Sequence, residues 1–290
     1  MPWRPRWARG SAALAAAAAV VSLVVAGFTG VFAGSGPASR SHAANAALAQ
    51  PLTARPGQHG PAPAAAPAAR HGGQHPRTVA HARQAGRTSC TSVAHVGDST
   101  SVGMVAPAVL PAAAQRLQAQ YAQVGVRHLR VDASGGRSIV EALPGQVNGY
   151  YTARGMAAHG FHGCWVIALG TNDSANIAAG SLASRASRIG QMMSAAHGQP
   201  VLWVNTRTLD TAGPYAEANM KLWNQALRQA QARYPNLRIF DWASVSQPGW
   251  YIPDGIHYTS AGYAARAHAI AGALVKAFPA GGHSTSRIVR

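Results

Sequence analysis

The sequence predicts an α/β fold in which a five-stranded parallel sheet lies between two layers of helices, a three-layer, flavodoxin-like arrangement. From Cys90 onward, short apolar segments alternate with longer helix-like segments. The short segments are rich in β-branched and aromatic residues, as strands buried on both faces are. The chain has only eight acidic residues, and five Asp lie at or just beyond predicted strand ends, where such sheets hold their ligands.

Each predicted strand is a short apolar run. The first stops abruptly at a Gly-Asp-Ser turn, after which a helix-compatible segment begins, and the third stops at a glycine turn that starts with Gly170. The strands are predicted at residues 93–96, 128–132, 165–169, 201–205 and 238–240.

The predicted helices connect these strands and close the chain. Residues 215–234 carry apolar side chains at the spacing of an amphipathic helix. Thr259 or Ser260 is the expected cap of the last helix. The helices are predicted at residues 111–123, 138–151, 182–197, 215–234 and about 260–278.

The first 88 residues are predicted to lie outside the folded domain. Three Arg precede an uncharged stretch whose apolar centre, residues 14–32, is about long enough to span a bilayer. Residues 1–33 are therefore a cleaved signal peptide or a single transmembrane anchor, and the protein is exported, secreted or anchored to the outer face of the cytoplasmic membrane. Residues 34–88, rich in Ala, Pro, Gly and His, are predicted to be a disordered linker. The folded domain is expected at 89–279, and a flexible tail at 280–290.

The net charge of +17 does not indicate a nucleic-acid partner. Nine Arg precede Cys90 and no acidic residue does, so the leader and linker carry about half of this charge. The remaining basic residues are scattered, without the basic helix or the aromatic-basic alternation of nucleic-acid binders. Attraction to an acidic cell envelope or to anionic lipid head groups explains the positive charge equally well.

The two cysteines, Cys90 and Cys164, are predicted to form a disulfide. Each lies just upstream of an apolar strand that ends in a glycine turn, at Gly97 and at Gly170. If these strands are parallel neighbours, both sulfur atoms lie at the same end of the sheet, away from the Gly-Asp-Ser turn. Two buried free thiols are the alternative.

Four segments with polar or glycine residues fall on the predicted functional edge of the sheet. A serine hydroxyl becomes a nucleophile only if a base accepts its proton, a third group orients that base, and hydrogen-bond donors stabilise the oxyanion. The four segments supply all of these groups. They are residues 97–99, 132–138, 170–173 and 254–257.

The pattern assigns one role to each of five residues. Ser99 is the expected nucleophile, His257 the base, and Asp254 the group that orients the imidazole. The backbone N–H groups of Ser99 and Gly136 and the amide of Asn172 are the expected oxyanion donors. The order Ser, Asp, His is one of several that assemble this geometry.

These residues resemble the SGNH (GDSL-type) hydrolase superfamily, whose four marks match Ser99, Gly136, Asn172 and His257, with Asp254 at the spacing of its Asp-x-x-His motif. The resemblance covers about residues 90–278. It implies a flavodoxin-like sheet, a Ser-His-Asp triad and no metal or other cofactor. Three segments are also similar to catalytic domains that modify bacterial envelope polysaccharides; they are residues 132–139, 204–207 and 254–259.

The resemblance and the leader together predict an exported, monomeric serine esterase that acts on small acyl esters, such as O-acyl groups on cell-envelope glycans. Two alternatives stay open. The acyl group could pass to a glycan acceptor instead of water, which would make the protein an O-acyltransferase. The domain could also be a non-catalytic glycan-binding module on a hydrolase scaffold. If the leader is uncleaved, it also attaches the protein to a membrane.

Two further residues are candidates for substrate contacts. Arg207 follows a predicted strand and could line the cleft or form a salt bridge at its rim. Trp250 precedes the loop that carries Asp254 and could stack on a sugar or pack against that loop.

Overall fold

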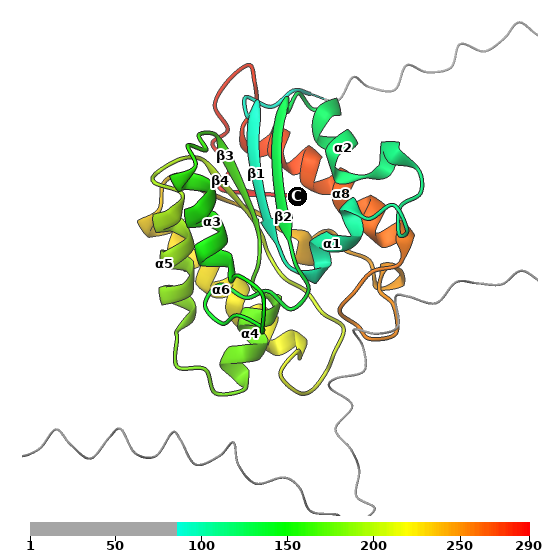
Figure 1. Cartoon of the computed structure of the whole chain (residues 1–290), viewed down its shortest axis with the longest axis vertical. Helices are drawn as coiled ribbons and strands as arrows, with labels where there is room; N and C mark the ends of the chain where they lie inside the picture. Colours follow the sequence, from blue (N-terminus) through cyan, green and yellow to red (C-terminus); the bar gives the residue numbers. More distant parts are fainter. Residues whose placement is uncertain (1–85) are drawn as a thin grey trace, which may run out of the picture. The chain divides into compact units, whose positions relative to one another are not determined.

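A computed structural model describes residues 86–290, which form an α/β fold around a six-stranded, fully parallel sheet with the order β2-β1-β3-β4-β5-β6. The strands β1 and β3, which correspond to the first and third predicted strands, are parallel neighbours in this sheet (Figure 1). The strands are β1 Ser92–Gly97, β2 His128–Ala133, β3 Cys164–Ala168, β4 Val201–Val204, β5 Leu237–Phe240 and β6 Ile288–Val289.

Helices cover both faces of the sheet, so the predicted three-layer fold is confirmed (Figure 1). One core cluster lies between the sheet and α1, α2 and α8, and the other lies between the sheet and α3, α5 and α6. The α-helices are α1 Ser99–Val105, α2 Leu117–Gln123, α3 Gly149–Ala158, α4 Thr171–Ala178, α5 Arg185–Ala195, α6 Glu217–Arg233, α7 Trp242–Val245 and α8 Ser260–Ala277. Two 3₁₀ turns are η1 Ala113–Gln115 and η2 Pro248–Trp250.

The strands β3 and β4 are apolar throughout because both faces of the sheet are covered there, whereas the edge strand β2, predicted as an apolar run, carries His128, Arg130 and Asp132 and is only partly buried. In β3, Val166 and Ala168 contribute to one core cluster, while Trp165 and Ile167 contribute to the other. Successive side chains of a strand point to opposite faces. Because both faces are buried, every position of the strand must be apolar.

The helix predicted at 138–151 and the flexible tail predicted at 280–290 are wrong in part. The helix predicted at 138–151 begins only at Gly149, because Pro144 and Gly145 interrupt the segment and the side chain of Asn148 caps the helix by accepting from the N–H of Tyr151. The tail predicted to be flexible ends in β6, which pairs with β5 and adds a sixth strand to the five predicted ones.

The predicted disulfide between Cys90 and Cys164 is confirmed, with the two Cα atoms 5.6 Å apart. Cys164 is the first residue of β3, and the register pairs it with Val93 of β1. The disulfide therefore joins the amino ends of two neighbouring central strands. Gly97, and with it the serine turn, lies at the opposite end of β1.

The predicted leader and most of the predicted linker lie outside the described residues. Within residues 86–290, no helix is both long and apolar enough to cross a membrane. The end of the predicted linker already belongs to the folded domain, since Thr88 is buried and its N–H donates to the carbonyl of Val124 at 2.9 Å.

Candidate active site

Ser99 is the first residue of α1 and is separated from the end of β1 by Asp98 alone. The turn is tight, because a Cβ atom at Gly97 would collide with the side chain of Ser101. Asp98 caps the helix and accepts hydrogen bonds from the N–H of Thr100 at 2.9 Å and from its hydroxyl at 2.7 Å. Complete burial raises the pKa of Asp98 in spite of these bonds. The local sequence thus fixes the backbone that carries the serine.

The structure brings Ser99 and His257 together across 158 residues of sequence. Nε2 of His257 lies 2.8 Å from Oγ of Ser99, and Nδ1 of the same ring lies 2.6 Å from Oδ2 of Asp254. A carboxylate only accepts hydrogen bonds, so Nδ1 carries the proton and Nε2 is the acceptor for the serine hydroxyl. The imidazole is therefore in the tautomer that accepts a proton from serine.

Asp254 is held by its own loop, just before α8. Its Oδ1 atom accepts from the N–H groups of Ile256 and His257, both at 2.9 Å. Partial burial raises the pKa of Asp254, but these bonds and the one from the His257 ring outweigh burial and lower the pKa below its usual value. The carboxyl group consequently stays ionised where it faces the imidazole.

Gly136 and Asn172 lie on two neighbouring segments that meet beside the serine turn. The segment after β2 is tied to the end of β1, because the N–H of Ser134 donates to the carbonyl of Gly97 at 3.3 Å. Gly136 has a φ of 70°, a left-handed conformation that glycine adopts without strain. Nδ2 of Asn172, at the start of α4, donates to the carbonyl of Arg137 at 3.0 Å.

Three residues near the site were not predicted from the sequence. The hydroxyl of Tyr215 donates to Oδ1 of Asn172 at 3.0 Å, and that of Tyr263 donates to the carbonyl of Ser99 at 3.3 Å. Arg266 is buried behind the serine turn, where it donates to the hydroxyl of Thr100 at 3.3 Å. Tyr263 and Arg266 lie on the predicted last helix, but nothing in their spacing distinguishes them from core residues.

The two predicted substrate contacts have structural partners. Nη1 of Arg207 donates to the carbonyls of Ala243 at 3.2 Å and of Ser246 at 2.6 Å, so this nitrogen braces α7 in place of the predicted rim salt bridge. Trp250 stacks on Trp242, with ring centroids 5.7 Å apart and an angle of 17° between the planes. One face of the Trp250 ring is therefore used in packing.

A surface hollow of about 560 Å³ lies at the other end of the sheet. It is lined by Ser92 and His128, the first residues of β1 and β2, and by neighbouring basic residues such as Arg127 and Arg130. None of the triad residues lines it. The candidate site is thus identified by its hydrogen bonds and not by the size of a cavity.

Comparison with known proteins is consistent with this chemistry. Residues 95–265 match the family described as GDSL-like Lipase/Acylhydrolase family. The comparison with curated proteins gives no match.

Solved structures similar to this chain include three enzymes. A carbohydrate acetylesterase family member from Sinorhizobium meliloti has a TM-score of 0.50 and 17% identity, over 63% of this chain and 97% of that one. The C-terminal catalytic domain of Streptococcus pneumoniae peptidoglycan O-acetyltransferase A has a TM-score of 0.48 and 17% identity, over 64% and 93%. A second S. meliloti carbohydrate acetylesterase, Est24, has a TM-score of 0.46 and 22% identity, over 62% and 96%. At 17% identity the likeness to the first of these structures concerns the fold alone.

Proposed function

Because the chain belongs to the GDSL-like lipase/acylhydrolase family, which implies ester hydrolase activity, we propose that it is an exported serine esterase for small acyl esters. The observation that carries the proposal is the continuous hydrogen-bonded series from Asp254 through His257 to Ser99. A carboxylate, an imidazole and a hydroxyl in this order are the groups that nucleophilic acyl transfer requires.

In the first half-reaction, Oγ of Ser99 attacks the carbonyl carbon of the ester while Nε2 of His257 takes the hydroxyl proton. The resulting tetrahedral intermediate collapses as the bond to the alcohol oxygen breaks. His257 gives its proton to that oxygen, and the alcohol leaves. Asp254 stabilises the imidazolium that exists between these two proton transfers. The acyl group then remains on Ser99 as an ester.

In the second half-reaction, water attacks the acyl-enzyme. His257 takes a proton from the water, and the carboxylic acid leaves as the proton returns to Oγ of Ser99. In both steps the negative charge on the former carbonyl oxygen is stabilised by the N–H groups of Ser99 and Gly136 and by the amide of Asn172. Each such donor typically contributes a factor of about 10²–10³ to turnover.

The proposed substrate is an acetyl or similarly short ester on a cell-envelope glycan. The disulfide between Cys90 and Cys164 supports a compartment outside the cytoplasm, because disulfides persist in oxidising environments. The predicted leader and the basic composition agree with a protein that works in an acidic envelope. Enzymes described as carbohydrate acetylesterases share the fold.

The proposal is tested by turnover of p-nitrophenyl acetate and by acetate release from an O-acetylated polysaccharide. We expect Ser99→Ala to lose both activities, and Ser194→Ala, a substitution of an exposed serine on α5, to keep both. Unchanged turnover by Ser99→Ala would refute the serine mechanism. Ester hydrolysis without acetate release from the polysaccharide would refute the proposed substrate class while leaving the esterase mechanism in place.

A further inference from the structure

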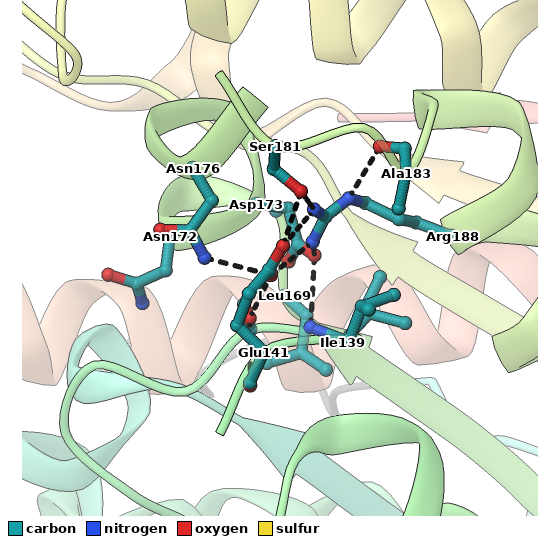
Figure 2. A network of polar contacts seen from close by, with 12 residues as sticks. Ile139, Glu141, Leu169, Asn172, Asp173, Asn176, Ser181, Ala183 and Arg188 are labelled. Atoms are coloured by element: carbon teal, nitrogen blue, oxygen red, sulfur yellow. Dashed lines mark hydrogen bonds and ion pairs between the residues drawn. The ribbon is translucent and has the colours of Figure 1, made fainter. Parts of the chain in front are cut away.

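The guanidinium of Arg188 lies at the centre of a polar network that joins α5, α4 and the segment after β2 (Figure 2). Its side chain, on α5, is fully buried. Nη1 donates to Oδ1 of Asp173 at 2.8 Å and to Oε2 of Glu141 at 2.6 Å, while Nη2 donates to Oε1 of Glu141. Nε donates to the carbonyl of Ala183 at 3.0 Å. One cation therefore binds two carboxylates from different segments.

Those two carboxylates belong to the two segments that carry the proposed oxyanion donors. Asp173 follows Asn172 on α4, and Glu141 lies five positions after Gly136 on the segment that follows β2. Figure 2 shows Glu141, Asp173 and Arg188 converging, with Asn172 beside them on the same helix as Asp173.

The same two segments are joined by further contacts. Oδ1 of Asp173 accepts from the N–H of Ile139 at 2.9 Å. The Asn172 amide reaches the carbonyl of Arg137, as described above, and Nδ2 of Asn176 donates to Oε2 of Glu141 at 2.9 Å. Any shift of α4 relative to the segment after β2 must therefore strain several hydrogen bonds at once.

We propose that Arg188 and Glu141 are positioning residues that set the distance between the Gly136 N–H and the Asn172 amide in the oxyanion site. This inference rests on the proposed function. A buried ion pair is a costly way to stabilise a fold, because apolar residues of similar volume often serve as well. The ion pairs of Arg188 instead fix the positions of the two segments, since the planar guanidinium binds each carboxylate in a defined direction.

The charges of the network fit this role. Burial raises the pKa of Glu141, but hydrogen bonds from Arg188, Ser181, Ser138 and Asn176 outweigh burial and bring the pKa far below its usual value. Burial raises the pKa of Asp173 to about 6, against the bonds from Ile139 and Arg188. Glu141 therefore stays ionised beside Arg188.

Two substitutions test the proposal, Glu141→Gln and Arg188→Lys. Both keep most of the side-chain volume. Glu141→Gln removes the charge that pairs with Arg188, and Arg188→Lys removes the planar guanidinium that makes two directed hydrogen bonds. A displacement of about 1 Å can cost up to about 10²-fold in rate, so we expect kcat for p-nitrophenyl acetate to fall at least about tenfold with KM within twofold. Phenylboronic acid, whose adduct with serine occupies the oxyanion site, should bind more weakly by the same factor as kcat falls.

The matched control is Ser184→Ala, which removes the cap of α5, the helix that carries Arg188, without touching the network. It should lower the melting temperature and leave both kcat and the boronic acid affinity unchanged. The side chain of Glu141 is 36% exposed, so we expect Glu141→Gln to fold. This variant alone tests the proposal if Arg188→Lys does not fold.

The outcomes separate this inference from the proposed function. If Ser99→Ala is inactive while Glu141→Gln keeps the wild-type kcat and boronic acid affinity, the positioning role is wrong and the serine mechanism stands. If Ser184→Ala lowers kcat as much as Glu141→Gln does, the network serves the fold and not the site, and the inference is also wrong. If Ser99→Ala keeps wild-type turnover, the proposed function is wrong, and the inference that rests on it is wrong too.

Discussion

The hydroxyl of Tyr215 donates a hydrogen bond of 3.0 Å to Oδ1 of Asn172. At the other end of the same amide, Nδ2 donates to the carbonyl of Arg137, also at 3.0 Å. An amide nitrogen carries two N–H donors. The contacts with Tyr215 and Arg137 therefore fix which end of the amide is oxygen, and the second N–H of Nδ2 is the one that we assign to the oxyanion.

Removing the hydroxyl of Tyr215 should weaken catalysis without affecting the fold. Tyr215→Phe loses one hydrogen bond worth about 1 kcal/mol, so we expect kcat to fall about fivefold, whereas Asn172→Ala should cost about 10²–10³. The measurement is kcat and KM for p-nitrophenyl acetate at matched protein stability. Wild-type kcat in Tyr215→Phe would mean that the amide needs no orienting partner.

Asp254→Asn should leave the fold intact and nearly abolish turnover. An asparagine amide at this position can donate a hydrogen bond to Nδ1 of His257, which favours the tautomer that cannot accept the serine proton. The corresponding change in a serine protease lowers kcat by about 10⁴, and we expect a loss of similar size. A variant with a wild-type melting temperature and only a few-fold loss of kcat would contradict the assigned role of Asp254.

The contribution of Glu141 to stability should depend on pH. Its pKa in the folded protein is lowered, so the carboxylate stabilises the fold above its unfolded pKa of about 4.3, and this stabilisation is lost as the pH falls below that value. The difference in free energy of unfolding between the wild type and Glu141→Gln should therefore be largest near neutral pH and shrink toward pH 3. Urea titrations at several pH values measure it, and a difference that does not change with pH would contradict the prediction.

Loss of the disulfide should lower stability but not activity. In the chain-entropy model a loop of 74 residues contributes about 4 kcal/mol, so the double variant Cys90→Ala, Cys164→Ala should unfold at much lower denaturant concentration. Its kcat at 20 °C should equal that of the wild type, because the disulfide lies at the end of the sheet away from Ser99. A large loss of kcat in a variant that is still folded would show that the disulfide supports the site.

The sequence predicts those parts of the site that lie in short, local patterns. Gly-Asp-Ser at a strand end and Asp-x-x-His before a helix place Ser99, Asp254 and His257 by local rules of turns and caps. Because five of the strands are also evident from their apolar runs, the convergence of these loops at one edge of the sheet follows from the parallel topology.

The supporting residues have no such signal. Arg188 is one of two arginines in a helix whose sequence resembles that of a surface helix, and its partners are 15 and 47 residues away. Tyr215 lies in an irregular segment, and its contact depends on how that segment folds over α4. Strand β6 is only two residues long, too short for a periodic pattern, and it exists because the edge of β5 offers it unpaired hydrogen-bonding groups.

The central claim, that Ser99 is the nucleophile and His257 its base, is tested most directly by covalent labelling with a fluorophosphonate. We expect peptide mass spectrometry of the wild type to find the probe on Ser99 alone, and the labelling rate to fall by at least about 10³-fold in His257→Ala. Labelling of another serine, or unchanged labelling of Ser99 in His257→Ala, would contradict the account.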